Sequence, residues 1–407
     1  MARLKEYNGH YCESEYEYAF IGFLEAEGWI YSSGNNISRV TKRDVLIADD
    51  FKKFIVDTNP DLTEDEVTQI FDNVRLVGSE SDFATLHKVY GWMVDGMQFT
   101  PQDGIARMIP LIDFKKDSNK NIFRVVNQFT VEYTNNGQKE NRRPDVLLFV
   151  NGMPLCVIEL KNPADANATI YDAWEQINIR YWRDIPHLLH YCPLACIFDG
   201  VKTRLGTVRT PYEHFYAWRR VNDGDAVSTL PFEETETMIK GVYAPERFLE
   251  IFRDYIYFQD SIYDSDEVEI VCRYPQFFAA RLLKQSIINS VVQKSGKGGT
   301  YFGATGCGKT YTMAFLARQL ALRCTDIPEI GSPTIILIVD RDELQKQGAK
   351  LFTKSKEFLN LGEVAVVKNR AQLRQELGAR QSGGFYICTI QKFCDREDDK
   401  IGLINDR

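Results

Sequence analysis

The sequence lacks the marks of membrane, secreted and zinc-binding proteins. No apolar run approaches the length of about 18 residues that a membrane helix needs, so we expect neither a membrane span nor a signal peptide. The nine cysteines form no C-x-x-C pair and lie mostly inside apolar runs, which favours reduced thiols over disulfides or a zinc site. Internal repeats and low-complexity tracts are also absent. These absences predict a cytoplasmic protein with no membrane partner.

Residues 142–163, RRPDVLLFVNGMPLCVIELKNP, are the most informative stretch of the chain. Two apolar runs flank Asn151-Gly152, and Asn-Gly in that context is the strongest short signal for a two-residue hairpin turn. The stretch therefore predicts two antiparallel strands joined by a tight turn.

Acidic and basic side chains gather at the open end of this predicted hairpin. Pairing about the turn sets Asp145 opposite Ile158 and beside Glu159, and a shift of one residue would still leave the two acids within a residue or two. Glu159 and Lys161 are two apart, so on a strand they project from the same face, about 6.6 Å apart. Two carboxylates and an ammonium group thus converge.

Paired carboxylates suit a hard divalent cation such as Mg²⁺. Such a cation can polarise a phosphodiester and activate a water, while a nearby lysine stabilises the developing charge. The alternative is a solvated Glu-x-Lys edge with Asp145 in the preceding turn. The pattern therefore leaves a metal-dependent nuclease site and a solvated strand edge as the two interpretations.

A second motif lies in residues 299–320, GTYFGATGCGKTYTMAFLARQL, which contain a complete G-x-x-x-x-G-K-[ST] loop before a helical segment. Its glycines let backbone amides close around phosphates, while Lys309 would reach the β- and γ-phosphates and Thr310 would bind Mg²⁺. The alternative is a glycine-rich loop that binds nothing. The predicted ATP site consists of Gly303, Thr305, Gly306, Cys307, Gly308, Lys309 and Thr310.

The segments around this loop predict an α/β domain. A short apolar run precedes the loop, a buried strand is expected at 334–339, and a third strand at 384–393 follows a further helical pattern. This alternation of strands and helices is typical of a doubly wound parallel sheet. Upstream, a helix at 273–287 carries Gln276, which either hydrogen-bonds a purine edge or is an ordinary surface side chain.

In these motifs and their order, over most of residues 85–393, the chain resembles the N-terminal part of type I restriction endonuclease R (HsdR) subunits. The resemblance implies a PD-(D/E)xK nuclease domain followed by a superfamily 2 helicase or translocase motor. It also implies Mg²⁺ and ATP as cofactors, double-stranded DNA as substrate, methylase (M) and specificity (S) subunits as partners, and a prokaryotic cytoplasm. The matching stretches are RPDVLLFVNGMPLCVIELKNP, PLIDFKKDSNKNIFRVVNQFTVE, DIPHLLHYCPLACIFDG, RYPQFFAARL, GATGCGKTYTM, IVDRDELQKQ and TIQKF.

The resemblance also implies roles for individual residues. Asp145 and Glu159 match the metal-binding acids, and Lys161 matches the catalytic lysine. Gln176 matches the glutamine of a Q-x-x-x-Y element and is expected to assist at the active site. Tyr181 follows at the fifth position instead of the fourth, about 100° further around an α-helix, so its role stays open.

Related nuclease cores carry a further metal-binding acid on their first helix. The segment ESEYEYAFIGFLEAEGWIY has apolar residues at helical spacing and is predicted to be an amphipathic helix. Glu17 is preferred to Glu13 and Glu15 as the additional metal contact. A solvated acidic face is the alternative.

The length of 407 residues predicts two or three domains, and the motifs indicate two. The first, an endonuclease-like domain, spans 1–255 with its core at about 85–205, and the second, a RecA-like P-loop domain, spans 256–407. Residues 221–245 are rich in Asp, Glu, Thr, Gly and Pro and are expected to form a connector, with a shorter break near 262–269.

The expected RecA-like domain has no acidic Walker B box. After Gln391 no apolar strand leads into an Asp-Glu pair, and 394–400, CDREDDK, is typical of a loop. The motor domain is therefore expected to be truncated, either as a fragment or as a truncated gene product. We expect ATP binding without hydrolysis by this chain alone.

The formal net charge of −8 argues against DNA binding at first sight, but local basic patches decide that question. Arg142 and Arg143 adjoin the predicted hairpin and would contact a phosphate beside the scissile bond. The other clusters are expected to be solvated surface, and the acidic balance fits DNA affinity supplied mainly by partner subunits. The clusters are Lys115-Lys116-Lys120, Lys139-Arg142-Arg143 and Arg219-Arg220.

Two functions are therefore in play. The first is the restriction subunit of a type I enzyme, which cleaves both DNA strands with Mg²⁺ while an ATP-dependent motor translocates the DNA. The second is an ATP-binding module that docks on partner subunits and has no nuclease or ATPase activity of its own.

Overall fold

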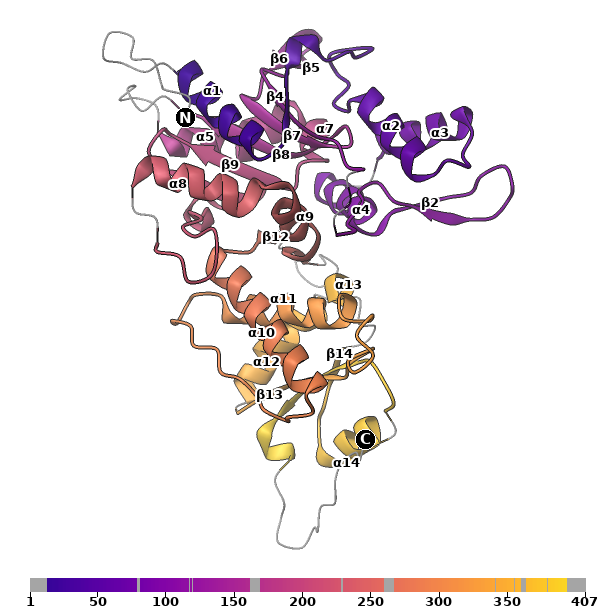
Figure 1. Ribbon diagram of the computed structural model, residues 1–407, viewed down its shortest axis with the longest axis vertical. Coiled ribbons are helices and arrows are strands. Elements are labelled where there is room, and N and C mark those ends of the chain that lie inside the picture. Colours follow the sequence, from indigo (N-terminus) through magenta and orange to yellow (C-terminus); the bar gives the residue numbers. More distant parts are fainter. Residues whose placement is uncertain are drawn as a thin grey trace, which may run out of the picture. The chain divides into compact units, whose positions relative to one another are not determined.

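The computed structural model of the chain contains two compact units that mix helices and strands (Figure 1). One unit comprises Met1–Arg253 with Glu269–Arg273, and the other comprises Asp254–Val268 with Tyr274–Arg407. No helix in the part of the chain that the structure describes is long and apolar enough to cross a membrane. The described residues are 13–78, 81–116, 118, 120–161, 169–227, 230–259, 267–340, 342–354, 356–359, 364–378 and 380–393.

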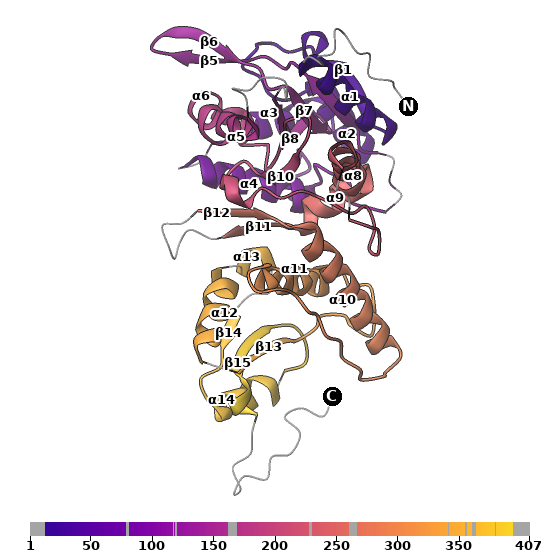
Figure 2. The same cartoon turned by 90° about the vertical axis from the view of Figure 1, so that its left-hand side faces the viewer.

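A six-stranded mixed sheet forms the core of the first unit (Figure 2). β1 is parallel to β4 and β8 is parallel to β9, whereas the other neighbours are antiparallel. All residues of the two central strands, β7 and β8, are buried, as their continuous apolar sequences require. The strand order is β1 (Ile30–Ser33), β4 (Phe123–Asn127), β7 (Val146–Val150), β8 (Met153–Leu160), β9 (Leu194–Phe198) and β10 (Thr203–Thr207).

The predicted hairpin turn is confirmed, because Val150 pairs with Met153 across Asn151 and Gly152. Both turn residues have positive φ, 51° and 75°, as this type of turn requires. A Cβ atom on Gly152 would lie 2.2 Å from the Ile47 carbonyl oxygen, so only glycine fits there.

The predicted register at the far end of the hairpin is wrong by one residue. A β-bulge between Leu148 and Phe149 leaves Leu155 out of the pairing, so that Val146, and not Asp145, lies opposite Ile158. Continuing this register places Asp145 directly opposite Glu159. A bulge adds one residue to one strand, and it therefore brings the two acids closer than the unbroken pairing would.

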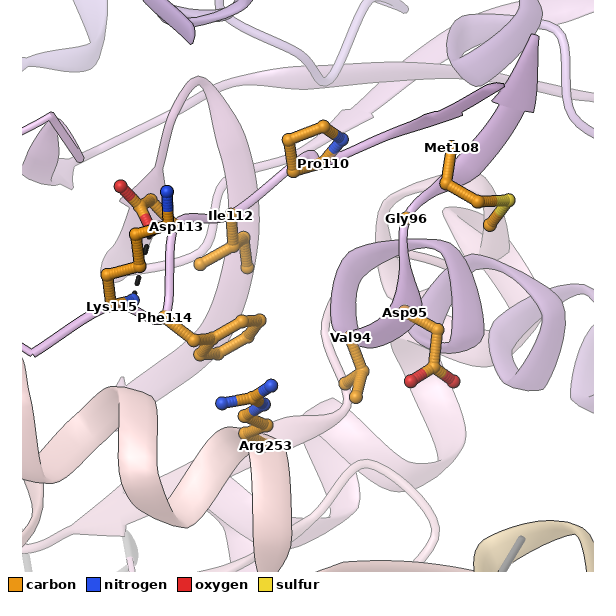
Figure 3. Close-up of a pocket in the computed structure, with 10 residues that line it drawn as sticks. All are labelled: Val94, Asp95, Gly96, Met108, Pro110, Ile112, Asp113, Phe114, Lys115 and Arg253. Carbon is orange, nitrogen blue, oxygen red and sulfur yellow. Dashed lines mark hydrogen bonds between the residues drawn. The ribbon is translucent and has the colours of Figure 1, made fainter. Parts of the chain in front are cut away.

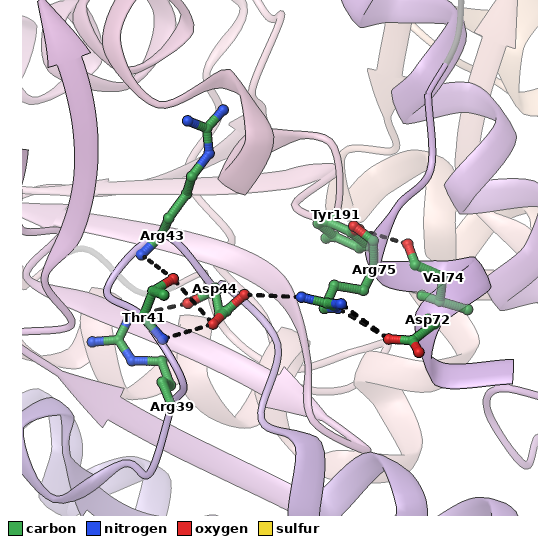
Figure 4. A network of polar contacts seen from close by, with 8 residues as sticks. All are labelled: Arg39, Thr41, Arg43, Asp44, Asp72, Val74, Arg75 and Tyr191. Carbon is green, nitrogen blue, oxygen red and sulfur yellow. Dashed lines mark hydrogen bonds and ion pairs between the residues drawn. The ribbon is translucent and has the colours of Figure 1, made fainter. Parts of the chain in front are cut away.

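A helical insertion separates β1 from β4 and is tied down by polar contacts. Asp44 accepts a hydrogen bond of 2.8 Å from the Thr41 amide and lies 3.6 Å from Arg75, and the Tyr191 hydroxyl donates to the Val74 carbonyl at 2.7 Å (Figure 4). The Arg75 contact holds α3 against the loop before α2, and the Tyr191 bond holds α3 against the segment after α7. The insertion comprises α2 (Ala48–Thr58), α3 (Glu64–Arg75), α4 (Asp82–Asp95), β2 (Met97–Phe99) and β3 (Arg107–Ile109).

Helices pack against the strand that carries Glu159. α1 (Glu13–Ala26), α5 (Ile170–Glu175) and the π-helix η2 (Gln176–Tyr181) all contact β8. The other elements before residue 272 are η1 (Gly34–Asn36), β5 (Val131–Asn135), β6 (Gln138–Arg142), α6 (Trp182–Asp184), α7 (Pro186–Leu189), η3 (Tyr212–His214), α8 (Pro231–Met238), η4 (Ile239–Tyr243), α9 (Pro245–Asp254), β11 (Ile256–Gln259) and β12 (Val268–Val271).

The connector expected at 221–245 is wrong, because this segment lies within the first unit and carries α8 and η4. Ile239, Val242 and Tyr243 are fully buried there. The segment contains a short apolar face at helical spacing among many acidic and threonine residues. Burial of this face places the segment in the first unit in spite of its polar composition. Of the break expected near 262–269, residues 262–266 lie outside the described part of the chain.

The second unit contains a parallel three-stranded sheet of order β13–β15–β14. The strand expected at 334–339 is present, and the one expected at 384–393 covers only Phe385–Thr389, because Ile390–Lys392 form a 3-10 turn. β14 was not predicted because three residues are too short for a pattern. The apolar run before the phosphate loop forms no strand within 293–304, since Tyr301 and Phe302 stand between glycines, which disfavour strands. The elements are α10 (Tyr274–Val292), α11 (Lys309–Leu322), β13 (Ile335–Val339), α12 (Asp342–Lys354), α13 (Lys356–Leu359), β14 (Val364–Val366), α14 (Arg370–Gly378), β15 (Phe385–Thr389) and η6 (Ile390–Lys392).

Candidate functional site

The open end of the β7–β8 hairpin brings together the three charged residues that the sequence singled out. The Leu160 amide donates a hydrogen bond of 2.8 Å to Asp145 Oδ2, which fixes this carboxylate beside β8. The Glu159 side chain is fully buried, and Lys161 Nζ lies 3.9 Å from Glu159 Oε2 with 15% of its side chain exposed. An apolar hairpin therefore ends in a buried acid, a second acid and a partly exposed lysine.

Gln176 joins this group from the helix that follows. Its side-chain oxygen accepts a hydrogen bond of 3.0 Å from Lys161 Nζ, and its Nε2 donates to Glu159 Oε2 at 2.7 Å. The Gln176 amide thus binds Lys161 through its oxygen and Glu159 through its nitrogen. The geometry fixes the orientation of Lys161 relative to Glu159.

Tyr181 also belongs to the site, and the α-helical placement that turned it away from Gln176 is wrong. Residues Gln176–Tyr181 form a π-helix, in which residues five apart share a face. The Tyr181 hydroxyl donates to Glu159 Oε1 at 2.5 Å and accepts from Gln176 Nε2 at 2.9 Å. The sequence carried one signal of this arrangement, the spacing that is one residue longer than in the related motif.

The electrostatics of the site disfavour two charged carboxylates side by side. Burial, and next the negative charge of Asp145, raise the pKa of Glu159 well above its ordinary value, although Lys161 and the Tyr181 hydroxyl act in the opposite direction. Burial and the neighbouring Glu159 likewise raise the pKa of Tyr181, so its hydroxyl stays a hydrogen-bond donor. Two carboxylates that repel each other are stabilised either by a shared proton or by a divalent cation between them. The donor set therefore fits Mg²⁺, which prefers oxygen ligands.

Glu17 lies near this edge of the sheet but is held by amide groups. Its two carboxylate oxygens accept hydrogen bonds from Asn127 Nδ2 at 2.6 Å and Gln128 Nε2 at 2.8 Å. The Gln128 backbone amide in turn donates to the Asp145 carbonyl at 3.0 Å. Among the described residues, no three acidic, histidine or cysteine side chains form a metal-ligand cluster, so a metal contact by Glu17 stays a prediction.

The phosphate loop, in the second unit, has the backbone that its glycines predict. Gly306 and Gly308 have φ of 80°, and α11 begins directly after them at Lys309. Lys309 Nζ donates to the carbonyl oxygens of Gly303 at 2.8 Å and Ala304 at 2.9 Å, so the ammonium group lies over the loop. Three further predicted site residues, Thr305, Gly306 and Thr310, are exposed.

Gln276, on α10, contacts the phosphate loop from behind. Its Nε2 donates to the carbonyl oxygens of Cys307 at 3.3 Å and Gly308 at 3.2 Å, and only 5% of the residue is exposed. A Cβ atom on Gly308 would lie 2.3 Å from this nitrogen, so the glycine makes room for the amide. These bonds position the loop, and a contact with a purine stays a prediction.

The residues of the basic clusters differ in their contacts. Arg142 pairs with Asp184, Nη2 to Oδ2 at 2.6 Å, whereas Arg143 is exposed and has no acidic partner among the described residues. Lys115 lines a cavity of about 370 Å³ in the first unit, where the Arg253 guanidinium lies 4.8 Å from the Phe114 ring centre (Figure 3). None of the predicted catalytic residues lines this cavity.

Comparisons with known families agree with the division of motifs along the chain. The family model "Type I restriction enzyme R protein N terminus" matches residues 11–214, about half of the chain. A second model, "SWI2/SNF2 ATPase", matches residues 275–407. The predicted nuclease residues fall in the first match and the phosphate loop falls in the second.

Curated proteins similar to the chain carry related names. The "Type I restriction enzyme HindI endonuclease subunit" of Haemophilus influenzae is 29% identical over 97% of this chain, and the "Putative type I restriction enzyme MjaIXP endonuclease subunit" of Methanocaldococcus jannaschii is 28% identical over 96%. A "Type I restriction enzyme SauCOLORF180P endonuclease subunit" of Staphylococcus aureus is 27% identical over 67%. The chain spans 38% of the length of each of the first two relatives.

Proposed function

Since the chain belongs to the family of type I restriction enzyme R proteins, we propose that it cleaves double-stranded DNA with Mg²⁺ in its first unit and binds ATP in its second. In this proposal the first unit is a PD-(D/E)xK nuclease and the second is part of a RecA-like motor that, in a full complex, translocates DNA. The observation that carries the nuclease proposal is the buried Glu159 facing Asp145 with Lys161 beside it.

Each residue of the site has a distinct part in the proposed cleavage. Mg²⁺ held by Asp145 and Glu159 would polarise the scissile phosphodiester and lower the pKa of a bound water. Lys161 would orient that water and stabilise the charge that develops on the phosphate.

The remaining side chains position these groups. Gln176 holds Lys161 through its side-chain oxygen, and Gln176 Nε2 and the Tyr181 hydroxyl each donate to one oxygen of Glu159. Both bonds favour the charged form of this carboxylate, which a cation requires. Gln176 and Tyr181 would therefore position Lys161 and favour the charged form of Glu159.

ATP would bind at the loop Gly303–Thr310 on the pattern of other phosphate loops. Thr310 would bind the Mg²⁺ that accompanies the nucleotide, and Lys309 would exchange its two loop carbonyls for phosphate oxygens. Residues 394–407 lie outside the described part of the chain.

The proposed setting is a restriction complex in a prokaryotic cytoplasm, with methylase and specificity subunits as partners. The names of the relatives, which are endonuclease subunits of type I restriction enzymes, support this setting. They do not favour the second interpretation, in which the chain only binds ATP and docks on other subunits.

Calorimetric titration of Mg²⁺ into the purified chain, with and without ATP, tests the proposal. Uptake without ATP that is lost in Asp145→Ala/Glu159→Ala would support a metal site at the hairpin, and cutting of plasmid DNA in Mg²⁺ would support the nuclease. Uptake only with ATP, unchanged in the double variant, would contradict the nuclease proposal and leave the phosphate loop as the metal site.

A further inference from the structure

A two-stranded hairpin, here called the arm, projects from the sheet edge beside the candidate nuclease site. The arm consists of β5 and β6, which pair antiparallel from Val131↔Arg142 to Asn135↔Gln138 around a turn at Asn136-Gly137. It forms a sheet of its own, outside the six-stranded sheet, and Figure 2 shows it extending away from that sheet. Strands of five residues give it a length of about 17 Å.

Both ends of the arm lead into the candidate site. Gln128, three residues before the arm, bonds Glu17 through its side chain and the Asp145 carbonyl through its backbone amide. Asp145 itself follows Arg142 by three residues. The base of the arm is therefore next to the acids, and its turn lies about 17 Å further out.

The base of the arm is fixed to α6, which follows directly after the π-helix that carries Tyr181. Arg142 bonds Asp184 through Nε at 2.7 Å and lies 5.5 Å from the Tyr133 ring centre, and the Tyr133 hydroxyl donates to Glu140 at 2.6 Å. These contacts join both strands of the arm to α6. The arm is therefore held in one direction relative to the site.

The outer part of the arm offers amide and ammonium groups and no apolar contact. Its exposed side chains include Asn136, Gln138, Lys139 and Asn141, and no large apolar side chain of 131–143, all of which the structure describes, is exposed. Glu132 pairs with Lys139 at 2.9 Å, and Glu140 accepts hydrogen bonds from Tyr133 and Asn135, so each acid of the arm has a partner within the arm. Protein interfaces are centred on aromatic and apolar side chains, so this surface suits a polar partner better.

We propose that the arm enters the major groove of the DNA duplex beside the phosphodiester at the Asp145–Glu159 site. The major groove is about 12 Å wide and about 8.5 Å deep and admits a two-stranded ribbon. Lys139, whose side chain is 79% exposed, exchanges its ion pair with Glu132 for a phosphate oxygen, and the amide of Gln138 meets base edges. This inference rests on the proposed nuclease function and adds a positioning surface to it.

The test measures binding of a short fluorescein-labelled duplex to the full chain in Mg²⁺, by anisotropy, in a Lys161→Ala background that keeps the duplex uncut. Gln138→Ala/Lys139→Ala is expected to raise Kd about ten-fold or more and to reduce the slope of log K against log salt by about 0.9, the loss of one phosphate contact. A matched control, Gln98→Ala/Lys53→Ala, also removes one exposed amide and one lysine from a surface ion pair and is expected to bind as the parent does.

Two results would overturn the inference. Parental affinity and salt slope in Gln138→Ala/Lys139→Ala would show that the arm does not touch DNA, and plasmid cutting by the wild-type chain would then leave the nuclease proposal standing. Absence of both duplex binding and cutting in the wild-type chain would remove both proposals together. Lys139→Ala alone, an exposed change that leaves the turn intact, reports the salt slope if the double variant unfolds.

Discussion

Replacement of Tyr181 by phenylalanine tests whether the Tyr181–Glu159 hydrogen bond supports Mg²⁺ binding or contributes only to the stability of the fold. The residue is 1% exposed, and the change removes one oxygen from a side chain of nearly unchanged shape. That oxygen is the donor to Glu159 Oε1, while Glu159 Oε2 keeps its bond from Gln176. Tyr181→Phe therefore leaves half of a buried carboxylate without its donor.

The magnitude follows from the charge that the hydroxyl stabilises. A hydrogen bond to a charged group contributes about 1.5 to 3 kcal/mol, and the Tyr181 hydroxyl lowers the pKa of Glu159 in the folded chain. Because Mg²⁺ binds the charged carboxylate, its Kd should rise about 10- to 150-fold, and the pH at which half of the chain binds Mg²⁺ should move upward. Calorimetric titrations of Mg²⁺ over a series of pH values measure both effects.

A matched control is Tyr191→Phe. Tyr191 is 3% exposed and its hydroxyl donates to the Val74 carbonyl at 2.7 Å, so this variant also loses one buried hydrogen bond. It is expected to unfold at a lower urea concentration and to bind Mg²⁺ with unchanged affinity. If Tyr181→Phe binds Mg²⁺ like the wild type at every pH, the reasoning from the Tyr181–Glu159 bond is refuted.

Three further predictions concern the titration of Glu159, the independence of the two proposed sites and the hairpin turn. Because the pKa of Glu159 is raised on folding, the metal-free chain should lose stability as the pH rises from about 4.3 towards this raised pKa, by about 1.4 kcal/mol for each unit of difference. Glu159→Gln should remove this slope in urea unfolding, and an unchanged slope would exclude Glu159 as its source. Lys161→Ala should abolish DNA cutting and leave binding of a fluorescent ATP analogue intact, whereas Lys309→Ala should abolish binding of the analogue. Equal loss of cutting and of analogue binding in either variant would contradict the proposal of two separate sites. Gly152→Ala should destabilise the first unit by about 2 kcal/mol or more, because the added Cβ would lie 2.2 Å from the Ile47 carbonyl oxygen and φ of Gly152 is positive. A urea unfolding midpoint equal to that of the wild type would show that the turn adapts to the added methyl group.

The nuclease-like hairpin illustrates what the sequence could predict. Asn151-Gly152 defined the turn because both residues tolerate positive φ, and the alternation of apolar runs defined the strands. The bulge at Leu155 was hidden because the apolar run continues through it without a glycine or polar residue. Local sequence determined the hairpin, and tertiary packing determined its register.

Other differences between the predicted and the observed structure also arise from tertiary packing. The burial of Ile239 and Tyr243 depends on contacts with residues far away in the chain, which composition does not reveal. The three residues of β14 form a strand because β15 lies beside them. The positive φ of Gly306 and Gly308 and the helix start at Lys309, in contrast, follow the motif, since they depend on glycines within the motif itself.

The π-helix at Gln176–Tyr181 has a consequence for how this candidate site is found in other genomes. One residue inserted into an α-helix rotates everything after it by about 100°, which would separate the two ends of the motif. A π-turn absorbs the inserted residue within a single turn, so Gln176 and Tyr181 still meet on Glu159. Searches with a fixed gap of three between glutamine and tyrosine would discard this chain, and a pattern that accepts a gap of three or four would recover it.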